Sequence, residues 1–303
     1  MEKRIMTIFT RTPLHVGAGN SVGAVDAPVM RERHTRIPII PGTSLKGVLA
    51  DLWLSDVETC EEDGRTKTRR KASSELLWLF GSDDANAASA GALLIGEARV
   101  LAFPVRSAKG GFAWVTCPLA LARYKRDAAG AEFAIPEAPT ESECLAGPTV
   151  QFATEKKVIL EEYCFAVKGE APKDVTTALG KLSDDAVWQA VGERLVIVSD
   201  ELFTYFVEHA CEVVTRVRID DATGTVAQGA LFNQEQVPSE TLFYAVIAGQ
   251  AQKGKDVATR KDAAAALGAL DAKLKQEAKG VLQLGGDETT GLGWCSVAMQ
   301  EVK

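Results

Sequence analysis

The chain has 303 residues, of which 46% are hydrophobic and 25% charged, and these values are typical of a globular protein. No segment approaches the roughly 20 apolar residues that span a bilayer, and the polar start MEKRIMTIFTRTPLH does not fit a secretion signal. The six cysteines stand singly, which excludes a zinc site built on closely paired cysteines. We therefore expect a cytoplasmic protein with no membrane partner.

Charge is unevenly distributed along the chain. The net charge of −7 argues against a generic nucleic-acid-binding protein, which is normally basic. Residues 1–50, however, carry seven Lys or Arg against three acids, whereas residues 51–303 carry 27 against 38. Such segregation fits a protein that holds a polyanion along one groove, and it fits an ordinary solvated face equally well.

Hydrophobic patterns predict a mixture of strands and helices without a steady βαβ order. We expect a half-buried strand at 4–10, a long irregular loop over 11–38, and a helix over 45–53 with Thr43 or Ser44 as its N-cap. Residues 51–90 are mostly polar and predict a flexible insertion that holds a short helix. The later elements are strands at 92–105, 112–121, 195–200, 241–249, 281–286 and 295–299, helices at 201–210 and 255–279, and a hairpin over 213–232. Residues 122–192 give no clear pattern. The fold class is α+β on an antiparallel sheet.

Three segments carry chemical interest. The loop 285–293 is rich in glycine, which lets backbone N–H groups approach a phosphate, although a tight turn between strands explains it equally well. The helix start at Thr43–Lys46 offers free N–H groups and a lysine to an anion. The loop 11–38 places Asp26 among basic residues, where a carboxylate can hold a divalent ion or orient a ribose hydroxyl, or simply pair with an arginine.

Five segments together resemble a known family. They are PLHVGAGNSVGAVDAPVMRERHT, IPIIPGTSLKG, LLIGEARVLAFPVRSAKGGFAWVTCPLALARY, RIDDATGTVAQGALFNQEQVPSETLF and LGGDETTGLGW. In this order they resemble the backbone (Cas7-like) subunit of the type III-B (Cmr) CRISPR effector complex, in the RAMP superfamily. The resemblance runs from about residue 7 to 297 and is weakest over 55–90 and 122–192.

The resemblance implies an architecture and a set of partners. It implies a single domain over 1–303, an RRM-like (ferredoxin-like) palm with helical and loop insertions, a flexible insertion at 51–90, and a β-hairpin thumb at 213–238. Such subunits stack head to tail along a guide RNA and cut complementary target RNA at periodic sites. The implied partners are guide RNA, target RNA, further copies of the chain, and other Cmr subunits, including the small subunit and the large polymerase-like subunit.

The resemblance also implies roles for single residues. Asp26 falls at the family's cleaving aspartate and is the implied ligand of a divalent metal, Mg²⁺ or Mn²⁺, with His15 as a helper. The implied RNA-binding residues are Arg31, Arg33, Ser44, Lys46, Arg216, Arg218, Gly285, Gly286, Thr289 and Gly291. In the hairpin, Leu231 or Phe232 is expected to wedge against bases.

Three alternatives stay open at this stage. The first is a filament subunit of the same superfamily that binds guide RNA and cuts nothing. The second is a guide-processing ribonuclease of the related double ferredoxin-like fold, an enzyme that usually relies on a histidine with a tyrosine or lysine. The third is a metabolic enzyme with a phosphate-binding glycine loop.

Overall fold

The centre of the structure is a four-stranded antiparallel sheet. The structure is a computed structural model that describes residues 1–19, 25–62, 65–82, 88–220, 222–252 and 260–301. The four strands are β1 (Glu2–Thr10), β5 (Leu93–Ser107), β13 (Leu242–Gly249) and β15 (Trp294–Glu301), and they lie in the order β15–β1–β13–β5. Helix α1 (Gly42–Asp51) follows β1 and packs on β5, and α7 (Ala263–Gln276) follows β13 and packs on β13, β1 and β15. This β-α-β-β-α-β order is ferredoxin-like and confirms the predicted palm.

Strand β1 is more deeply buried than its sequence suggests. Alternation of apolar and polar residues predicts one exposed face, yet all six residues from Ile5 to Thr10 are buried. The strand is central, because β13 pairs with one edge and β15 with the other. Phe9 also packs against Trp188, with ring centroids 5.5 Å apart, so residues from the second half of the chain cover this part of the palm.

The sheet extends past both edges of the four-stranded palm: β14 pairs with β15, and five strands follow β5. The full order is β14–β15–β1–β13–β5–β6–β10–β7–β9–β8, and the pairs β6–β10 and β7–β9 are parallel. The added strands are β2 (Ile39–Ile40), β6 (Gly111–Thr116), β7 (Glu143–Ala146), β8 (Lys157–Leu160), β9 (Tyr163–Glu170), β10 (Leu195–Ile197) and β14 (Val281–Gln283). The uninformative stretch 122–192 therefore holds three sheet strands.

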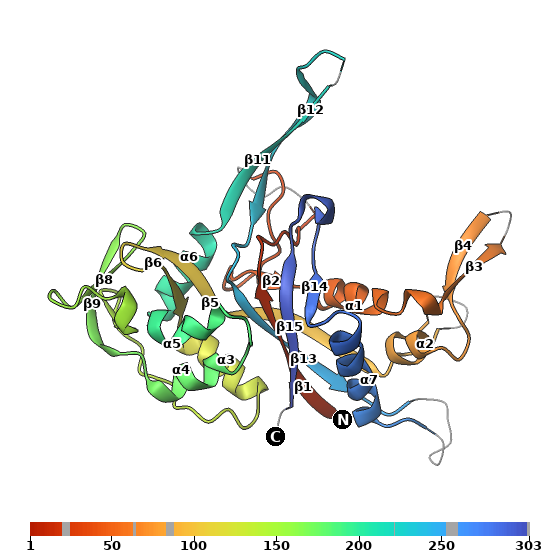
Figure 1. Ribbon diagram of the computed structural model, residues 1–303, viewed down its shortest axis with the longest axis horizontal. Coiled ribbons are helices and arrows are strands. Elements are labelled where there is room, and N and C mark those ends of the chain that lie inside the picture. Colours follow the sequence, from red (N-terminus) through yellow and green to blue (C-terminus); the bar gives the residue numbers. More distant parts are fainter. Residues whose placement is uncertain (20–24, 63–64, 83–87, 221, 253–259, 302–303) are drawn as a thin grey trace.

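Four helices accompany these strands, and one of them corrects a prediction. They are α3 (Pro118–Asp127), α4 (Lys173–Gly180), α5 (Val191–Arg194) and α6 (Asp200–His209), coloured yellow-green to teal in Figure 1. The strand predicted over 112–121 ends at Thr116, because Pro118 favours the first helical turn and the Cys117 sulfur accepts the Ala120 N–H at 3.4 Å. No helix among the described residues is long and apolar enough to cross a membrane.

The insertion at 51–90 contains secondary structure of its own. A short 3₁₀ turn (Leu54–Asp56) leads into an antiparallel hairpin of β3 (Val57–Glu62) and β4 (Arg65–Arg70), followed by α2 (Glu75–Phe80). The hairpin extends from one end of the molecule, beside α2 (Figure 1). The sequence predicts the helix but not the strands, because both strands are polar on their two faces. The predicted flexibility stays a prediction.

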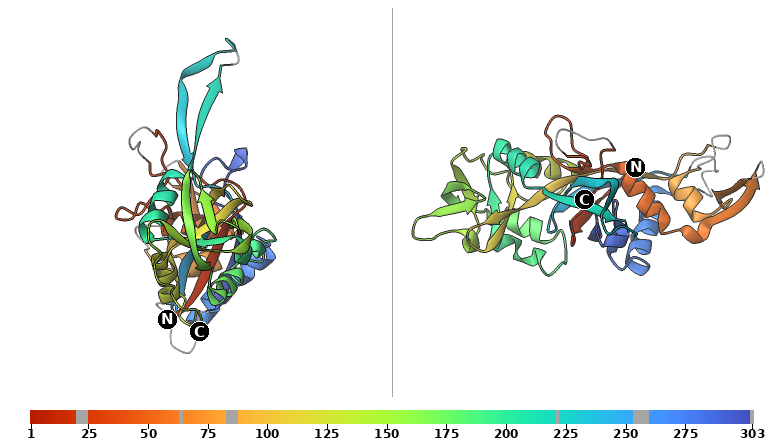
Figure 2. Two further views of the ribbon diagram at one scale, coloured as in Figure 1. Left: turned by 90° about the vertical axis from the view of Figure 1, so that its left-hand side faces the viewer. Right: turned by 90° about the horizontal axis from the view of Figure 1, so that it is seen from above.

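A second hairpin, which we call the projecting hairpin, stands out from the body (Figures 1 and 2). It consists of β11 (Glu212–Ile219) and β12 (Val226–Gln236) and begins directly after α6, close to the predicted 213–238. At its turn, the Asp220 carboxylate accepts the N–H groups of Ala222 and Thr223. Large apolar side chains are exposed along both strands: Val213, Val214, Val217, Ile219, Val226, Leu231 and Phe232. Exposed apolar side chains that lie together in this way mark an interaction surface.

Candidate functional site at the base of the hairpin

The loop 11–38 is attached to the free edge of β12. Strand β11 occupies one edge of β12, so the other edge presents unpaired backbone groups. Ala27 fills part of this edge: its N–H donates to the Asn233 carbonyl at 3.0 Å, and its carbonyl accepts the Glu235 N–H at 2.9 Å. Leu14 and Val237 exchange two further bonds of 2.8 Å. The long loop is therefore fixed to the base of the hairpin by backbone pairing.

Asp26 lies at this junction with its carboxylate open to solvent. Its Oδ2 atom accepts the backbone N–H of Asn233 at 2.9 Å, while the residue as a whole is exposed. No Lys, Arg or His among the described residues forms a salt bridge with it, which argues against the salt-bridge alternative. One oxygen is thus held in place, and Oδ1 is left to bind an ion or a hydroxyl group.

His15 lies beneath the hairpin base and makes a structural contact. Its side chain is buried, and Nδ1 lies 2.7 Å from the Glu235 carbonyl oxygen. Because a carbonyl only accepts, Nδ1 carries the hydrogen and donates it. The His15 carbonyl in turn accepts the N–H of Gly286 at 2.9 Å. His15 therefore connects the hairpin to the glycine-rich loop, and no hydrogen bond joins it to Asp26 in the described structure.

Arg31 is committed to protein partners, which does not support the predicted RNA contact. Its side chain is 4% exposed, and one guanidinium nitrogen lies 2.6 Å from Oε1 of Glu235. The guanidinium also donates to the carbonyls of Arg36 and Val207, at 2.7 and 2.9 Å. Glu235 accepts the Val29 N–H through its other carboxylate oxygen. This pair joins the Asp26 loop, the end of α6 and the hairpin base.

The glycine-rich loop also differs from its prediction as a phosphate cradle. The N–H of Gly286 donates to His15, and that of Gly291 donates to the Glu288 carbonyl at 3.0 Å, so neither is free for a phosphate. Gly285 is required for close packing, because a Cβ there would lie 2.3 Å from the His15 carbonyl oxygen. Thr289 is exposed in the short 3₁₀ turn Glu288–Thr290 and keeps its hydroxyl available.

A polar network that the sequence does not reveal joins this loop to the hairpin. The Arg216 Nε donates to the Gln234 side-chain oxygen at 2.7 Å, and the Gln234 amide donates to Asp287 at 2.5 Å. Gln236 donates to the same Gln234 oxygen at 3.2 Å. Arg216 thus has a positioning contact within the protein, although its side chain is still 23% exposed. The polar run NQEQ at the end of an apolar strand is the only sequence signal for this network.

The remaining predicted residues lie on two other surfaces. Arg218 is exposed on the projecting hairpin, and Arg33 is exposed in the loop that follows Asp26; neither forms a hydrogen bond or ion pair among the described residues. Helix α1 carries half-buried Ser44 and exposed Lys46. Its N-cap is Pro41 rather than Thr43 or Ser44, so the helix begins at Gly42, where a Cβ would lie 2.5 Å from the Ile95 carbonyl oxygen.

The donor set at Asp26 suits an ion that is shared with a substrate. The described residues contain no group of three or more His, Cys, Asp or Glu side chains that could hold a metal. Mg²⁺ is usually bound by one or two carboxylates together with substrate phosphates and water. The single open carboxylate of Asp26 fits that mode and does not fit an all-protein cage.

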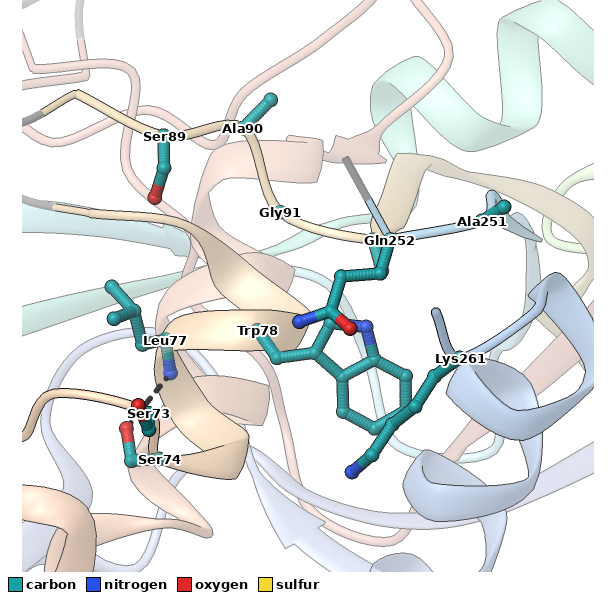
Figure 3. Close-up of a pocket in the computed structure, with 11 residues that line it drawn as sticks. Ser73, Ser74, Leu77, Trp78, Ser89, Ala90, Gly91, Ala251, Gln252 and Lys261 are labelled. Atoms are coloured by element: carbon teal, nitrogen blue, oxygen red, sulfur yellow. Dashed lines mark hydrogen bonds between the residues drawn. The ribbon is translucent and has the colours of Figure 1, made fainter. Parts of the chain in front are cut away.

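A cavity elsewhere shares no residue with this site. It has a volume of about 310 Å³ and lies between α2 and the segments at 89–92 and 251–252 (Figure 3). The Lys261 ammonium lies 4.0 Å from the ring centroid of Trp78 on its wall. We assign this cavity no part in the site at Asp26.

A ferredoxin-like palm, a projecting hairpin and an open carboxylate at the hairpin base define an α+β protein with a candidate site at the junction of palm and hairpin. A model of the RAMP superfamily matches residues 7–296. The CRISPR system Cmr endoribonuclease Cmr4 of Pyrococcus furiosus is 36% identical over 310 residues, which cover 100% of this chain and 97% of that protein. The chain belongs to the RAMP superfamily and, within it, to the family of the Cmr4 endoribonucleases.

Solved structures agree with this membership. Oligomeric Cmr4 from Pyrococcus furiosus matches with a TM-score of 0.70 and 28% identity, and the match covers 100% of both chains. A chain of the type III-B Cmr-beta complex bound to cognate target RNA matches the fold with a TM-score of 0.68 at 21% identity. A more distant relative, the Cms endoribonuclease Csm3 of Enterococcus italicus, is 36% identical over 90 residues, 29% of this chain and 41% of that protein.

Proposed function

We propose that this chain is the repeating, RNA-cutting subunit of a type III-B CRISPR effector complex. Copies of it hold a guide RNA, and each copy cuts the paired target RNA beside its own projecting hairpin. Family membership supports this function, because the full-length relative is named a Cmr endoribonuclease. The other proposed partners are the Cmr subunits of the complex, including the small subunit and the large polymerase-like subunit.

The placement of Asp26 is the observation that carries the proposal. Its carboxylate is anchored by the Asn233 N–H at the point where the hairpin leaves the body. The strands of that hairpin expose apolar side chains, among them Leu231 at 62% and Phe232 at 39%. Apolar and aromatic side chains of this kind stack against unpaired bases. A nucleotide displaced by the hairpin would thus come to lie beside a fixed carboxylate.

The cleavage chemistry needs little more than positioning. A ribose 2′-hydroxyl that lies in line with its own phosphate can attack it, which breaks the bond to the next 5′-oxygen and leaves a cyclic phosphate. A regular A-form helix forbids this alignment, whereas a displaced nucleotide allows it. Asp26 would orient the hydroxyl and accept its proton, or hold a divalent ion, Mg²⁺ or Mn²⁺, that stabilises charge on the phosphate.

RNA binding is proposed for residues whose side chains form no hydrogen bond or ion pair among the described residues. Arg33, Lys46 and Arg218 are open to solvent and would contact phosphates, and Ser44 and Thr289 would add hydroxyl contacts. Arg31 and His15 instead hold the loop against the hairpin. Guide pairing would supply sequence specificity, so these residues need only recognise backbone and shape.

The test is a single substitution in an assembled complex. Asp26→Asn keeps an oxygen that can accept the Asn233 N–H but removes the charge and the proton acceptor. We expect guide binding to be unchanged and target cleavage to fall by at least about 10³-fold, a loss in the range of general-base and electrostatic contributions. Gel analysis of labelled target RNA with Mg²⁺ or Mn²⁺ measures cleavage, and a gel shift of labelled guide RNA measures guide binding. Glu155→Gln, in an exposed turn, is the control. Undiminished periodic cutting by Asp26→Asn would overturn the proposal.

A further inference from the structure

The outer edge of the last palm strand is only partly covered. Strand β14 pairs with β15 over Trp294–Ser296. One more backbone bond follows, from the Val297 N–H to the Gly280 carbonyl at 2.8 Å. There the pairing ends, because the Gly280 N–H bonds back to the Leu274 carbonyl near the end of α7 and residues 277–279 form the turn that leaves this helix. The rest of β15 has no neighbouring strand on this side among the described residues.

The direction of the free backbone groups follows from the bonds on either edge. Successive peptide groups along a strand point to opposite edges. The Trp294 carbonyl accepts the Arg11 N–H on the β1 side, and the Val297 N–H points to the β14 side. Met299 lies two residues beyond Val297, so its N–H and C=O also point outward. Among the described residues neither group has a hydrogen-bond partner, so they are a donor and an acceptor open at a strand edge.

This edge forms the floor of a groove of about 740 Å³. One wall is α7 and the other is the segment 181–184, whose Lys181 carbonyl accepts the Gln300 side-chain amide at 2.9 Å. The apolar residues of its lining are largely buried: Leu182 and Leu274 are 2% exposed and Val297 is 7% exposed, while Met299 is half-buried and offers most of the apolar side-chain surface. The floor therefore offers backbone pairing between two walls.

The rim of the groove carries an excess of positive charge. Lys181 and Lys279 are exposed and form no ion pair among the described residues. Lys275 pairs with Asp271 at 2.8 Å, and Asp271 also lies 3.4 Å from Arg4. Asp184 is the one remaining exposed acid of the lining, so two uncompensated lysines face one aspartate.

We propose that this groove binds an extended segment of a partner protein in which apolar and acidic residues alternate. The segment adds a strand to β15 beyond β14 and pairs with the Met299 N–H and C=O. Its apolar side chains enter the groove beside α7, and its acidic side chains reach Lys181 and Lys279. Strand addition of this kind draws affinity from main-chain bonds and specificity from pockets for alternate side chains. A nucleic acid lacks the amide groups that this edge pairs with. The inference does not depend on cleavage at Asp26.

A designed peptide tests the groove on the full chain. The probe is a fluorescein-labelled octapeptide of alternating valine and glutamate, and its binding is followed by fluorescence anisotropy. We expect two variants to weaken binding by at least about tenfold: Met299→Pro, which removes the outward N–H together with the thioether side chain, and the double variant Lys181→Glu/Lys279→Glu. Lys157→Glu, on β8 at the opposite end of the sheet, is the matched charge control and should change nothing.

Other outcomes contradict the proposal in distinct ways. The same peptide with N-methyl groups at alternate amides should not bind, and this arm holds even if Met299→Pro fails to fold. Equal binding of the methylated peptide, or no loss in either variant, would rule out strand addition. Displacement of the probe by a single-stranded RNA oligomer would show a nucleic-acid groove. A change in sedimentation coefficient caused by Lys279→Glu would show that the groove binds a second copy of the chain.

Discussion

At the scale of single residues, the site depends on a few long-range contacts that hold one loop in place. Asp26 is 207 positions from the Asn233 N–H that anchors it. His15 and Arg31 both reach Glu235, one its carbonyl and the other its carboxylate. Glu235 is therefore the common anchor of the loop. Substitution of His15 or Arg31 should therefore loosen the carboxylate of Asp26, although neither side chain is proposed to contact RNA.

The Arg31–Glu235 pair makes this expectation measurable. Arg31→Ala leaves a buried carboxylate without its cation, which typically costs about 3–5 kcal/mol. We expect a loss of that size in the free energy of unfolding from urea denaturation. In an Arg31→Ala/Glu235→Gln double variant, part of the loss should be recovered, since no buried charge remains. If the loss of stability in the double variant equals the sum of the losses in Arg31→Ala and in Glu235→Gln, the two residues do not interact as described.

Glu240 gives the chain a dependence on pH. Burial raises its pKa from the usual 4.5 to about 7, and the charge of Asp185 acts in the same direction. One carboxylate oxygen is buried with no partner among the described residues. Between these two pKa values the folded state keeps a proton that the unfolded state releases, so this contribution to stability falls as pH rises from 4.5 to 7.

The matching experiment compares melting temperatures at pH 5 and pH 8. The side chain is only half-buried, so we expect a modest effect, with Glu240→Gln melting on the order of 2 °C above the native chain at pH 8 and close to it at pH 5. Glu155→Gln, which is exposed, should melt like the native chain at both values. A rise in melting temperature from Glu240→Gln that is larger at pH 5 than at pH 8 would contradict the raised pKa of Glu240.

At the scale of elements, the projecting hairpin carries large apolar side chains that are exposed. Leu231 and Phe232 are exposed, so Leu231→Ser and Phe232→Ser should change the melting temperature by little. If the hairpin displaces target nucleotides, the same variants should slow cleavage by about tenfold, since a stacked base is worth about 1–3 kcal/mol. Normal cleavage rates in the double variant would show that these side chains do not act on RNA.

Sequence patterns predict the palm well and the peripheral elements poorly. Strands β1, β5 and β13 are apolar and long enough to be recognised, and outside the palm α6 agrees to within one residue with the helix predicted over 201–210. The β3–β4 hairpin is invisible because its residues are polar on both faces. Strands β7 and β8 have four residues each, too few for a period to be read.

The site is predictable in its central residue and not in its surroundings. Asp26 is found through a motif, whereas its anchor is a backbone N–H that any residue except proline would supply at position 233. Arg31 resembles an RNA-binding residue because a sequence does not show that Glu235 lies 2.6 Å away. Gly285 and Gly286 fit a phosphate loop as well as they fit close packing against His15, and only the fold distinguishes the two.

At the scale of the whole molecule, the proposed cutting site lies on one side of the body. The hairpin and the Asp26 loop lie at one side of the body, and both ends of the chain lie at the opposite side in Figure 1. The contacts that hold Asp26 come from within the chain, so in the proposed filament each copy would carry its own set. Cleavage at each target position should then depend on the one copy that lies there.

Complexes assembled from mixtures of native and Asp26→Asn chains test this claim most directly. The measurement is the intensity of each band in the target-cleavage ladder, at early times, against the fraction of variant chains. If each copy cuts its own site through Asp26, every band should weaken in linear proportion to that fraction while its position stays fixed. Bands that keep full intensity in complexes made only of Asp26→Asn chains would contradict the account.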